Sequence, residues 1–144
     1  MRVSDTASSP TCPRMRMILL VLLAAIYVPF GLLHLVSPRS MLAIMPPVVP
    51  FKLPLILFTG ACEIAGGIGL LVPRTRRLAA IMLSIYALCV WPANIWHAVS
   101  GVHVPPLPDS WWYHGPRLAF QPVLAWWPLV AAGVVDWPLR RSGR

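Results

Sequence analysis

Six polar side chains inside otherwise apolar segments are the residues of this chain best suited to chemistry. They comprise a carboxyl, two imidazoles, two amides and a guanidinium: Glu63, His34, His97, Asn94, Gln121 and Arg117. A carboxyl and an imidazole exchange protons near neutral pH, whereas amides and a guanidinium hydrogen-bond polar groups. We therefore expect a proton relay of Glu63, His34 and His97. We expect a pocket for a polar head lined by Asn94, Arg117 and Gln121.

The composition places these residues in a membrane. Of 144 residues, 58% are hydrophobic and 11% are charged, against roughly 25% charged in ordinary soluble domains. So few charges do not cover the surface of a water-soluble globule. This excludes a soluble enzyme domain, a disordered protein and a disulfide-stapled secreted module, and the length excludes several domains.

Four apolar runs predict the architecture, an all-α membrane protein with a bundle of four antiparallel transmembrane helices. The runs cover residues 15–36, 51–72, 78–99 and 118–135. A run of about 22 residues rises about 33 Å as a helix, enough for a hydrocarbon core of about 30 Å. We expect one membrane domain over residues 15–139. A disordered cytoplasmic tail at 1–14 would precede it, and a basic cytoplasmic tail at 140–144 would follow it.

The positions of the basic residues predict the orientation. The formal net charge is +8, but the charges flank the apolar runs and accompany no nucleic-acid-binding motif, so no nucleic-acid partner is expected. Nine of the twelve Lys and Arg fall on the side of the two termini, and the other three, Arg39, Lys52 and Arg117, fall opposite. The excess predicts that both termini are cytoplasmic.

This topology brings the six polar residues to one layer, between the midplane and the outer interface. Glu63 lies near the middle of its run, where an acidic residue costs roughly 2.5–3.5 kcal/mol on insertion scales, so it must face protein or water. Gly60, Gly66 and Gly67 lie three or four residues away and would let another helix cover it. Pro92 should kink the third run just before Asn94.

The remaining signals are weaker. The outer loops, Ser37–Pro50 and Ser100–Pro116, are rich in proline and are expected to be stiff rather than helical. Cys12, Cys62 and Cys89 form no C-x-x-C pair and predict neither a disulfide framework nor a redox motif. His103 and His114 lack metal-ligand spacing, so no metal site is expected.

Read in order, several short motifs resemble the DoxX family of small bacterial membrane proteins, which includes DoxX-like and DoxD relatives. The motifs are G-L-L-H-L at Gly31–Leu35, T-G-A-C-E-I-A-G-G-I-G-L-L at Thr59–Leu71, P-R-T-R-R-L-A-A at Pro73–Ala80, W-P-A-N-I-W-H-A at Trp91–Ala98 and R-L-A-F-Q at Arg117–Gln121. The resemblance implies a four-helix protein of the bacterial inner membrane. Its archetypal relatives are the small subunit of a thiosulfate–quinone oxidoreductase and a membrane partner in a thiol-stress complex.

The functional hypothesis that follows is an accessory or quinone-facing subunit in redox or stress-related metabolism. Quinone reduction takes up protons, which a carboxyl and imidazoles beside an apolar slot would exchange. No autonomous catalytic motif is present, so any enzymatic role is that of an oxidoreductase subunit. The expected partners are the lipid bilayer, a membrane or peripheral redox enzyme, and a second copy of the chain. Two alternatives stay open: a small proton-coupled transporter, and a non-catalytic scaffold or assembly factor.

Overall fold

A computed structural model gives the fold and describes residues 11–104 and 108–135. It contains five helices in this part of the chain and no strand: α1 (Thr11–Val36), α2 (Pro38–Ala43), α3 (Lys52–Leu71), α4 (Arg76–Val99) and α5 (Trp111–Ala131). The structure is therefore all-helical. Most of the predicted N-terminal tail and all of the predicted tail at 140–144 lie outside the described residues, but residues 11–14 already belong to α1.

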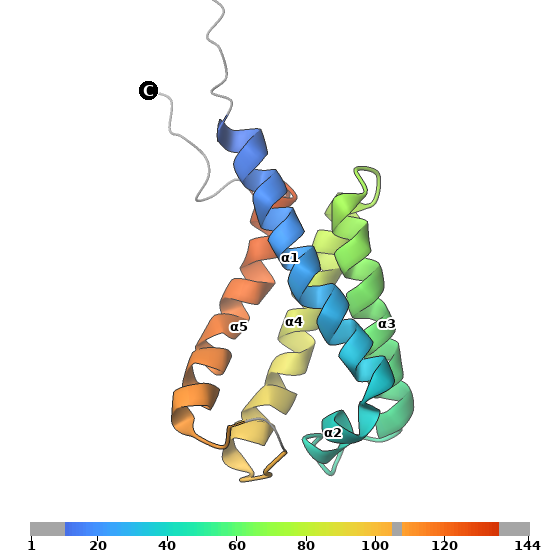
Figure 1. The fold of residues 1–144 in the computed structure, drawn as a ribbon, viewed down its shortest axis with the longest axis vertical. Coiled ribbons are helices and arrows are strands. Elements are labelled where there is room, and N and C mark those ends of the chain that lie inside the picture. The colour runs from blue at the N-terminus through green and yellow to red at the C-terminus, as the bar shows by residue number, and fades with distance from the viewer. Residues whose placement is uncertain (1–10, 105–107, 136–144) are drawn as a thin grey trace, which may run out of the picture.

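The four long helices run alternately up and down, as the short connections between them require (Figure 1). One end of the bundle, the turn end, holds the start of α1, the turn between α3 and α4 and the last residues of α5. The other, the loop end, holds α2 and the connection between α4 and α5. The most extensive contacts join α1 to α3 and α4 to α5, so the bundle consists of two helix pairs.

The apolar core that joins the two pairs lies towards the turn end. All four long helices contribute to it, through Leu20, Leu23, Tyr27, Leu70, Ala79, Ala80, Leu83 and Ala131. Gly66 and Gly69 face the side chains of Leu83 and Ala79, so α3 and α4 approach closely beside their turn. The six polar residues identified from the sequence lie beyond this core, in the middle of the bundle and at the loop end.

Apolar and polar residues are distributed in the reverse of the pattern in a soluble protein. Large apolar side chains such as Phe30, Ile68 and Ile85 are exposed, whereas Glu63 and Gln121 are buried. Three helices are long and apolar enough to cross a membrane: α1 from Arg14, α3 and α4. Buried polar groups beneath an apolar exterior are what a bilayer demands of spanning helices. The chain therefore has the character of a membrane protein.

Two predictions about the loop end are wrong. The fourth run was placed at 118–135, but α5 spans Trp111–Ala131, so the Trp111–Tyr113 segment is helical rather than part of a loop. The loop before α3 contains the short helix α2, which starts at Pro38. Proline at the first position of a helix costs no hydrogen bond and presets φ, so Pro38 favours a helix start. Within α5, Pro116 removes one backbone bond without ending the helix.

Candidate functional site

Glycine residues bring α1 and α3 together where the first group of polar residues lies. A Cβ atom at Gly60 would lie 2.7 Å from Cβ of His34 and 2.9 Å from the carbonyl oxygen of Gly31, and one at Gly31 would lie 3.0 Å from Cβ of Glu63. Any larger residue at either position would therefore force the helices apart. Small residues at a helix contact allow this backbone approach within a membrane, and here they place Glu63 against α1.

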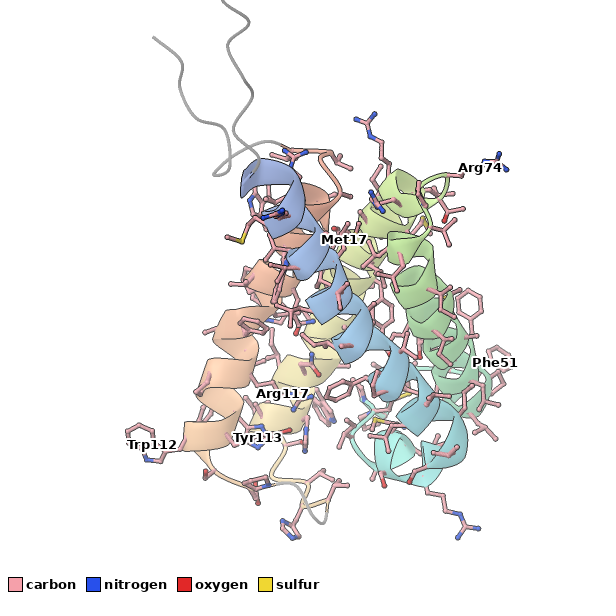
Figure 2. The ribbon with its side chains drawn as sticks, turned by 45° about the horizontal axis from the view of Figure 1, so that its top comes forward. Met17, Phe51, Arg74, Trp112, Tyr113 and Arg117 are labelled. Atoms are coloured by element: carbon pink, nitrogen blue, oxygen red, sulfur yellow. The ribbon has the colours of Figure 1, made fainter. Side chains whose placement is uncertain are left out.

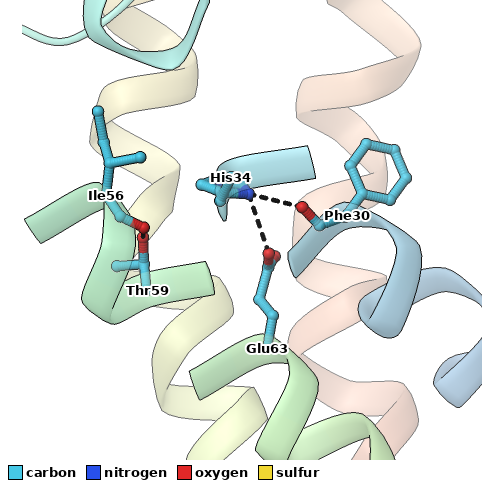
Figure 3. A network of polar contacts seen from close by, with 5 residues as sticks. All are labelled: Phe30, His34, Ile56, Thr59 and Glu63. Atoms are coloured by element: carbon cyan, nitrogen blue, oxygen red, sulfur yellow. Dashed lines mark hydrogen bonds and ion pairs between the residues drawn. The ribbon is translucent and has the colours of Figure 1, made fainter. Parts of the chain in front are cut away.

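The first group is centred on the Glu63 carboxylate. His34 on α1 directs Nδ1 at the carbonyl oxygen of Phe30, 2.8 Å away, and the same nitrogen lies 3.2 Å from Oε2 of Glu63 (Figure 3). The Nδ1–H donates to the Phe30 carbonyl, so the contact with Glu63 is electrostatic, and Oε2 receives no hydrogen bond. The Glu63 side chain is 7% exposed and that of His34 is 16% exposed. His34 is thus the more exposed member of the pair.

Two tyrosines that the sequence analysis did not single out complete this group. Tyr86 of α4 lies near Glu63. Tyr27 lies two helical turns before His34, packs edge-on against Tyr86 at a centroid distance of 6.4 Å, and has a buried hydroxyl without a hydrogen-bond partner. A tyrosine in the interior of an apolar run was the available signal, because a buried phenol needs a polar partner. Glu63 is therefore enclosed by α1, α3 and α4.

The second group is centred on Arg117 of α5, which reaches across to α4. Its Nη1 lies 2.9 Å from Nδ1 of His97, and its Nη2 donates to Oδ1 of Asn94. The Nδ2 of Asn94 donates in turn to Oε1 of Gln121 at 3.2 Å, and Nε2 of Gln121 donates to the carbonyl oxygen of Ala87 at 2.8 Å. Figure 2 shows Arg117 and Tyr113 turned towards α4 and Trp112 projecting away from the bundle.

His114 lies against the second group and was considered from sequence only as a metal ligand. Its ring is 3% exposed and packs edge-on against His97, with centroids 4.9 Å apart. Neither ring nitrogen makes a hydrogen bond, and the nearest carboxylate, that of Asp109, lies 3.8 Å from Nε2. Among the described residues, no set of three or more His, Cys, Asp or Glu side chains is arranged to hold a metal ion.

The six residues predicted to converge therefore fall into two groups on different helix pairs. His34 and Glu63 lie between α1 and α3, while His97, Asn94, Arg117 and Gln121 lie between α4 and α5. Within the part of the chain that the structure describes, no hydrogen bond or ion pair connects the groups. Sequence spacing identified which residues share a helix face, but the pairing of helices decided which faces meet.

Comparison with known families corrects the resemblance drawn from sequence motifs. Residues 23–132 match the family model described as Domain of unknown function (DUF8561), and no DoxX model matched. The identification with DoxX was therefore wrong. Several of its motifs consist of glycines at close helix contacts or arginines in a tight turn, features that unrelated small helical membrane proteins share. No curated protein and no solved structure matched the chain.

Proposed function

The chain belongs to the family described as Domain of unknown function (DUF8561), and because that description assigns no activity, we propose a function from the polar groups themselves. The proposal is a membrane-embedded accessory subunit of an oxidoreductase, in which Glu63 and His34 exchange protons with a quinone. The observation that carries it is the buried Oε2 of Glu63, which receives no hydrogen bond although His34 lies 3.2 Å away.

The chemistry of this pair suits proton exchange at a lipid-soluble carbonyl compound. Reduction of a quinone to a quinol takes up two electrons and two protons. The partner oxidoreductase supplies the electrons, since no redox motif occurs in this chain. Because Nδ1–H of His34 is held by the Phe30 carbonyl, Nε2 is the basic nitrogen of the neutral ring. In its imidazolium form the more exposed His34 would donate the Nε2 proton to the quinone and return to the neutral ring, and Glu63 in its carboxylic acid form would supply the second proton.

The apolar surroundings support a hydrophobic ligand. The helices that carry Glu63 and His34 expose large apolar side chains next to the pair, Phe30, Leu33 and Leu35 among them. A quinone diffusing in the bilayer would reach His34 without crossing water. Tyr86 of α4 adds a further polar side chain near Glu63 inside the bundle.

The proposal includes the path of the chain across the membrane. We place α5 across the membrane as a fourth span, because it runs the length of the bundle beside α4 (Figure 1). Both termini are cytoplasmic in this proposal: Arg14, Arg16, Arg74, Arg76 and Arg77 lie at the turn end, against Arg39, Lys52 and Arg117 towards the loop end. The expectation of a bacterial inner membrane rested on the DoxX resemblance and falls with it.

Quinone binding is the direct test. The protein is purified in nanodiscs from native membranes, bound quinone is extracted and quantified against a lipid blank, and menadione affinity is measured by tryptophan quenching. We expect Glu63→Gln and His34→Ala to weaken menadione binding about tenfold or more, because a hydrogen bond to a charged group contributes about 1.5–3 kcal/mol. Arg74→Gln, at an exposed residue of the opposite end, is the matched control.

Two results would overturn the proposal. One is the absence of quinone above the lipid blank together with the absence of menadione binding. The other is proton-coupled solute flux in liposomes that Glu63→Gln abolishes while menadione binding is unchanged. The second result would assign the same carboxylate to a small transporter, which would need a dimer to supply enough helices for alternating access.

A further inference from the structure

The side chains of the Arg117 group form a chain of hydrogen bonds in which each one donates to the next. Arg117 donates to Nδ1 of His97 and to Oδ1 of Asn94, Asn94 donates to Oε1 of Gln121, and Gln121 donates to a backbone carbonyl. Every side-chain acceptor in the group thus already receives a hydrogen bond.

The group nevertheless retains unused N–H donors. A guanidinium carries five N–H groups and each primary amide carries two, and the bonds above use two of the former and one of each amide. The indole nitrogen of Trp91, on the same face of α4 as Asn94, and the ring of His114 are buried without hydrogen-bond partners. What the group lacks is an acceptor.

The charge of the Arg117 group, like its unused donors, favours a negatively charged ligand. Arg117 is only partly exposed, and among the described residues no Asp or Glu lies within ion-pairing distance of its guanidinium. The nearby carboxylate of Asp109 faces His114 rather than Arg117. A cation held within an apolar bundle without a counter-charge is costly. The fork of a guanidinium, by contrast, matches the two oxygens of a carboxylate or phosphate.

From this donor excess we infer that the Arg117 group is a binding site for an oxyanion, either a carboxylate or a phosphate. Arg117 supplies the charge and the fork, while Asn94, itself bonded to Gln121, holds the guanidinium in place, and both amides offer their remaining N–H groups. The buried ring of His114 supplies one more donor beside them. The inference does not rest on the quinone proposal, which concerns Glu63 and His34.

The experiment separates a lipid headgroup from a free anion. Protein is reconstituted into nanodiscs of phosphatidylcholine alone, or with one third phosphatidylglycerol. The first sample is titrated with sodium acetate or inorganic phosphate against sodium chloride at equal ionic strength. The readout is the thermal unfolding midpoint, Tm, which rises when a ligand binds only the folded state. A rise with phosphatidylglycerol alone identifies a headgroup, and a rise with acetate or phosphate over chloride identifies a free oxyanion.

Three variants and one control assign the effect to this site. Arg117→Gln should abolish the rise in Tm, and Arg117→Lys should reduce it, because an ammonium keeps the charge but loses the fork. Asn94→Asp should raise Tm without any added anion and remove the response, because it places a carboxylate directly on Arg117. Arg39→Gln, an exposed arginine at the same end of the bundle, should respond like the wild type.

Several results would overturn the inference. Neither phosphatidylglycerol nor acetate or phosphate raises Tm of the wild type above the chloride reference, or Arg39→Gln loses the response as fully as Arg117→Gln. A third contrary result is that Asn94→Asp has a lower Tm than the wild type and still responds to the anion. If Arg117→Gln fails to fold, the Arg117→Lys and Asn94→Asp comparisons still decide the matter.

Discussion

His34 of α1 and Glu63 of α3 lie 3.2 Å apart, Nδ1 to Oε2, across a helix contact that Gly31 and Gly60 make close. The imidazole does not depend on the carboxylate for its position, because the Phe30 carbonyl on its own helix holds Nδ1 at 2.8 Å (Figure 3). The carboxylate depends on the imidazole for electrostatic compensation. This asymmetry determines how the two positions should respond to substitution.

Glu63→Leu should leave the bundle folded and abolish menadione binding. The leucine side chain fills a similar volume, and His34 keeps its bond to Phe30, so no buried charge is left unpaired. Glu63→Lys should instead destabilise the protein by about 3–5 kcal/mol, because it buries a cation beside the imidazole without an acid to pair with it. Thermal unfolding monitored by circular dichroism, together with size-exclusion profiles, separates the two. Equal stability of both variants would contradict the buried environment of Glu63.

Gly60→Leu should separate α1 from α3 and move His34 away from Glu63. The added side chain meets Cβ of His34 and the backbone of Gly31 at distances that atoms do not tolerate. We expect a clear loss of stability and the same loss of menadione binding as Glu63→Gln. The control is Gly115→Ala, where an added Cβ meets nothing within 4 Å and alanine is the better helix former by about 0.5–1 kcal/mol. A folded Gly60→Leu protein with normal binding would contradict this account of the helix contact.

Hydropathy alone located much of the fold. The predicted runs 51–72 and 78–99 differ from α3 (Lys52–Leu71) and α4 (Arg76–Val99) by less than one helical turn. The prediction of the fourth run began too late in the chain because Trp111–Tyr113, Gly115 and Pro116 have the composition of a loop. In the structure, packing against α4 stabilises a helix there despite three internal prolines. Tertiary contacts thus overrode local propensity at α5.

The candidate site was harder to anticipate than the fold. Spacing predicted that Asn94 shares a face with His97 and that Arg117 shares one with Gln121, and the structure joins these four residues in one network. Sequence spacing could not show that α1 pairs with α3 and α4 with α5. This pairing places Glu63 in a separate group. Tyr86 went unnoticed because a tyrosine in an apolar run also reads as an ordinary core residue.

Asn94 and Gln121 should stabilise the protein as a unit. Gln121→Ala leaves the N–H of Asn94 without its acceptor and removes the side-chain bond to the Ala87 carbonyl, and an unsatisfied buried polar group costs about 1–3 kcal/mol. Asn94→Ala removes the acceptor of Arg117. In a double-mutant cycle the two losses should be less than additive by more than about 0.5 kcal/mol, since both break one network. Chemical unfolding in detergent measures the cycle, and strict additivity would show that the residues act independently.

The last prediction concerns the path of the chain through the membrane. In a variant in which the native cysteines are replaced, single cysteines are placed at the positions of Arg74 in the α3–α4 turn, Trp112 at the start of α5 and Val135 just after its end. An impermeant maleimide added to intact cells should label Trp112→Cys only, while Arg74→Cys and Val135→Cys should react only after permeabilisation.

The physical reason is that α5 carries the chain from the loop end back to the turn end, where the excess of arginine favours the cytoplasm. A variant that keeps Cys89 as its single cysteine, on the exposed face of α4, should stay unlabelled from either side and serves as the negative control. Labelling of Val135→Cys in intact cells would show that α5 returns to the external face. The membrane domain would then contain the three spans α1, α3 and α4, and the Arg117 group would lie at the external surface instead of within the bilayer.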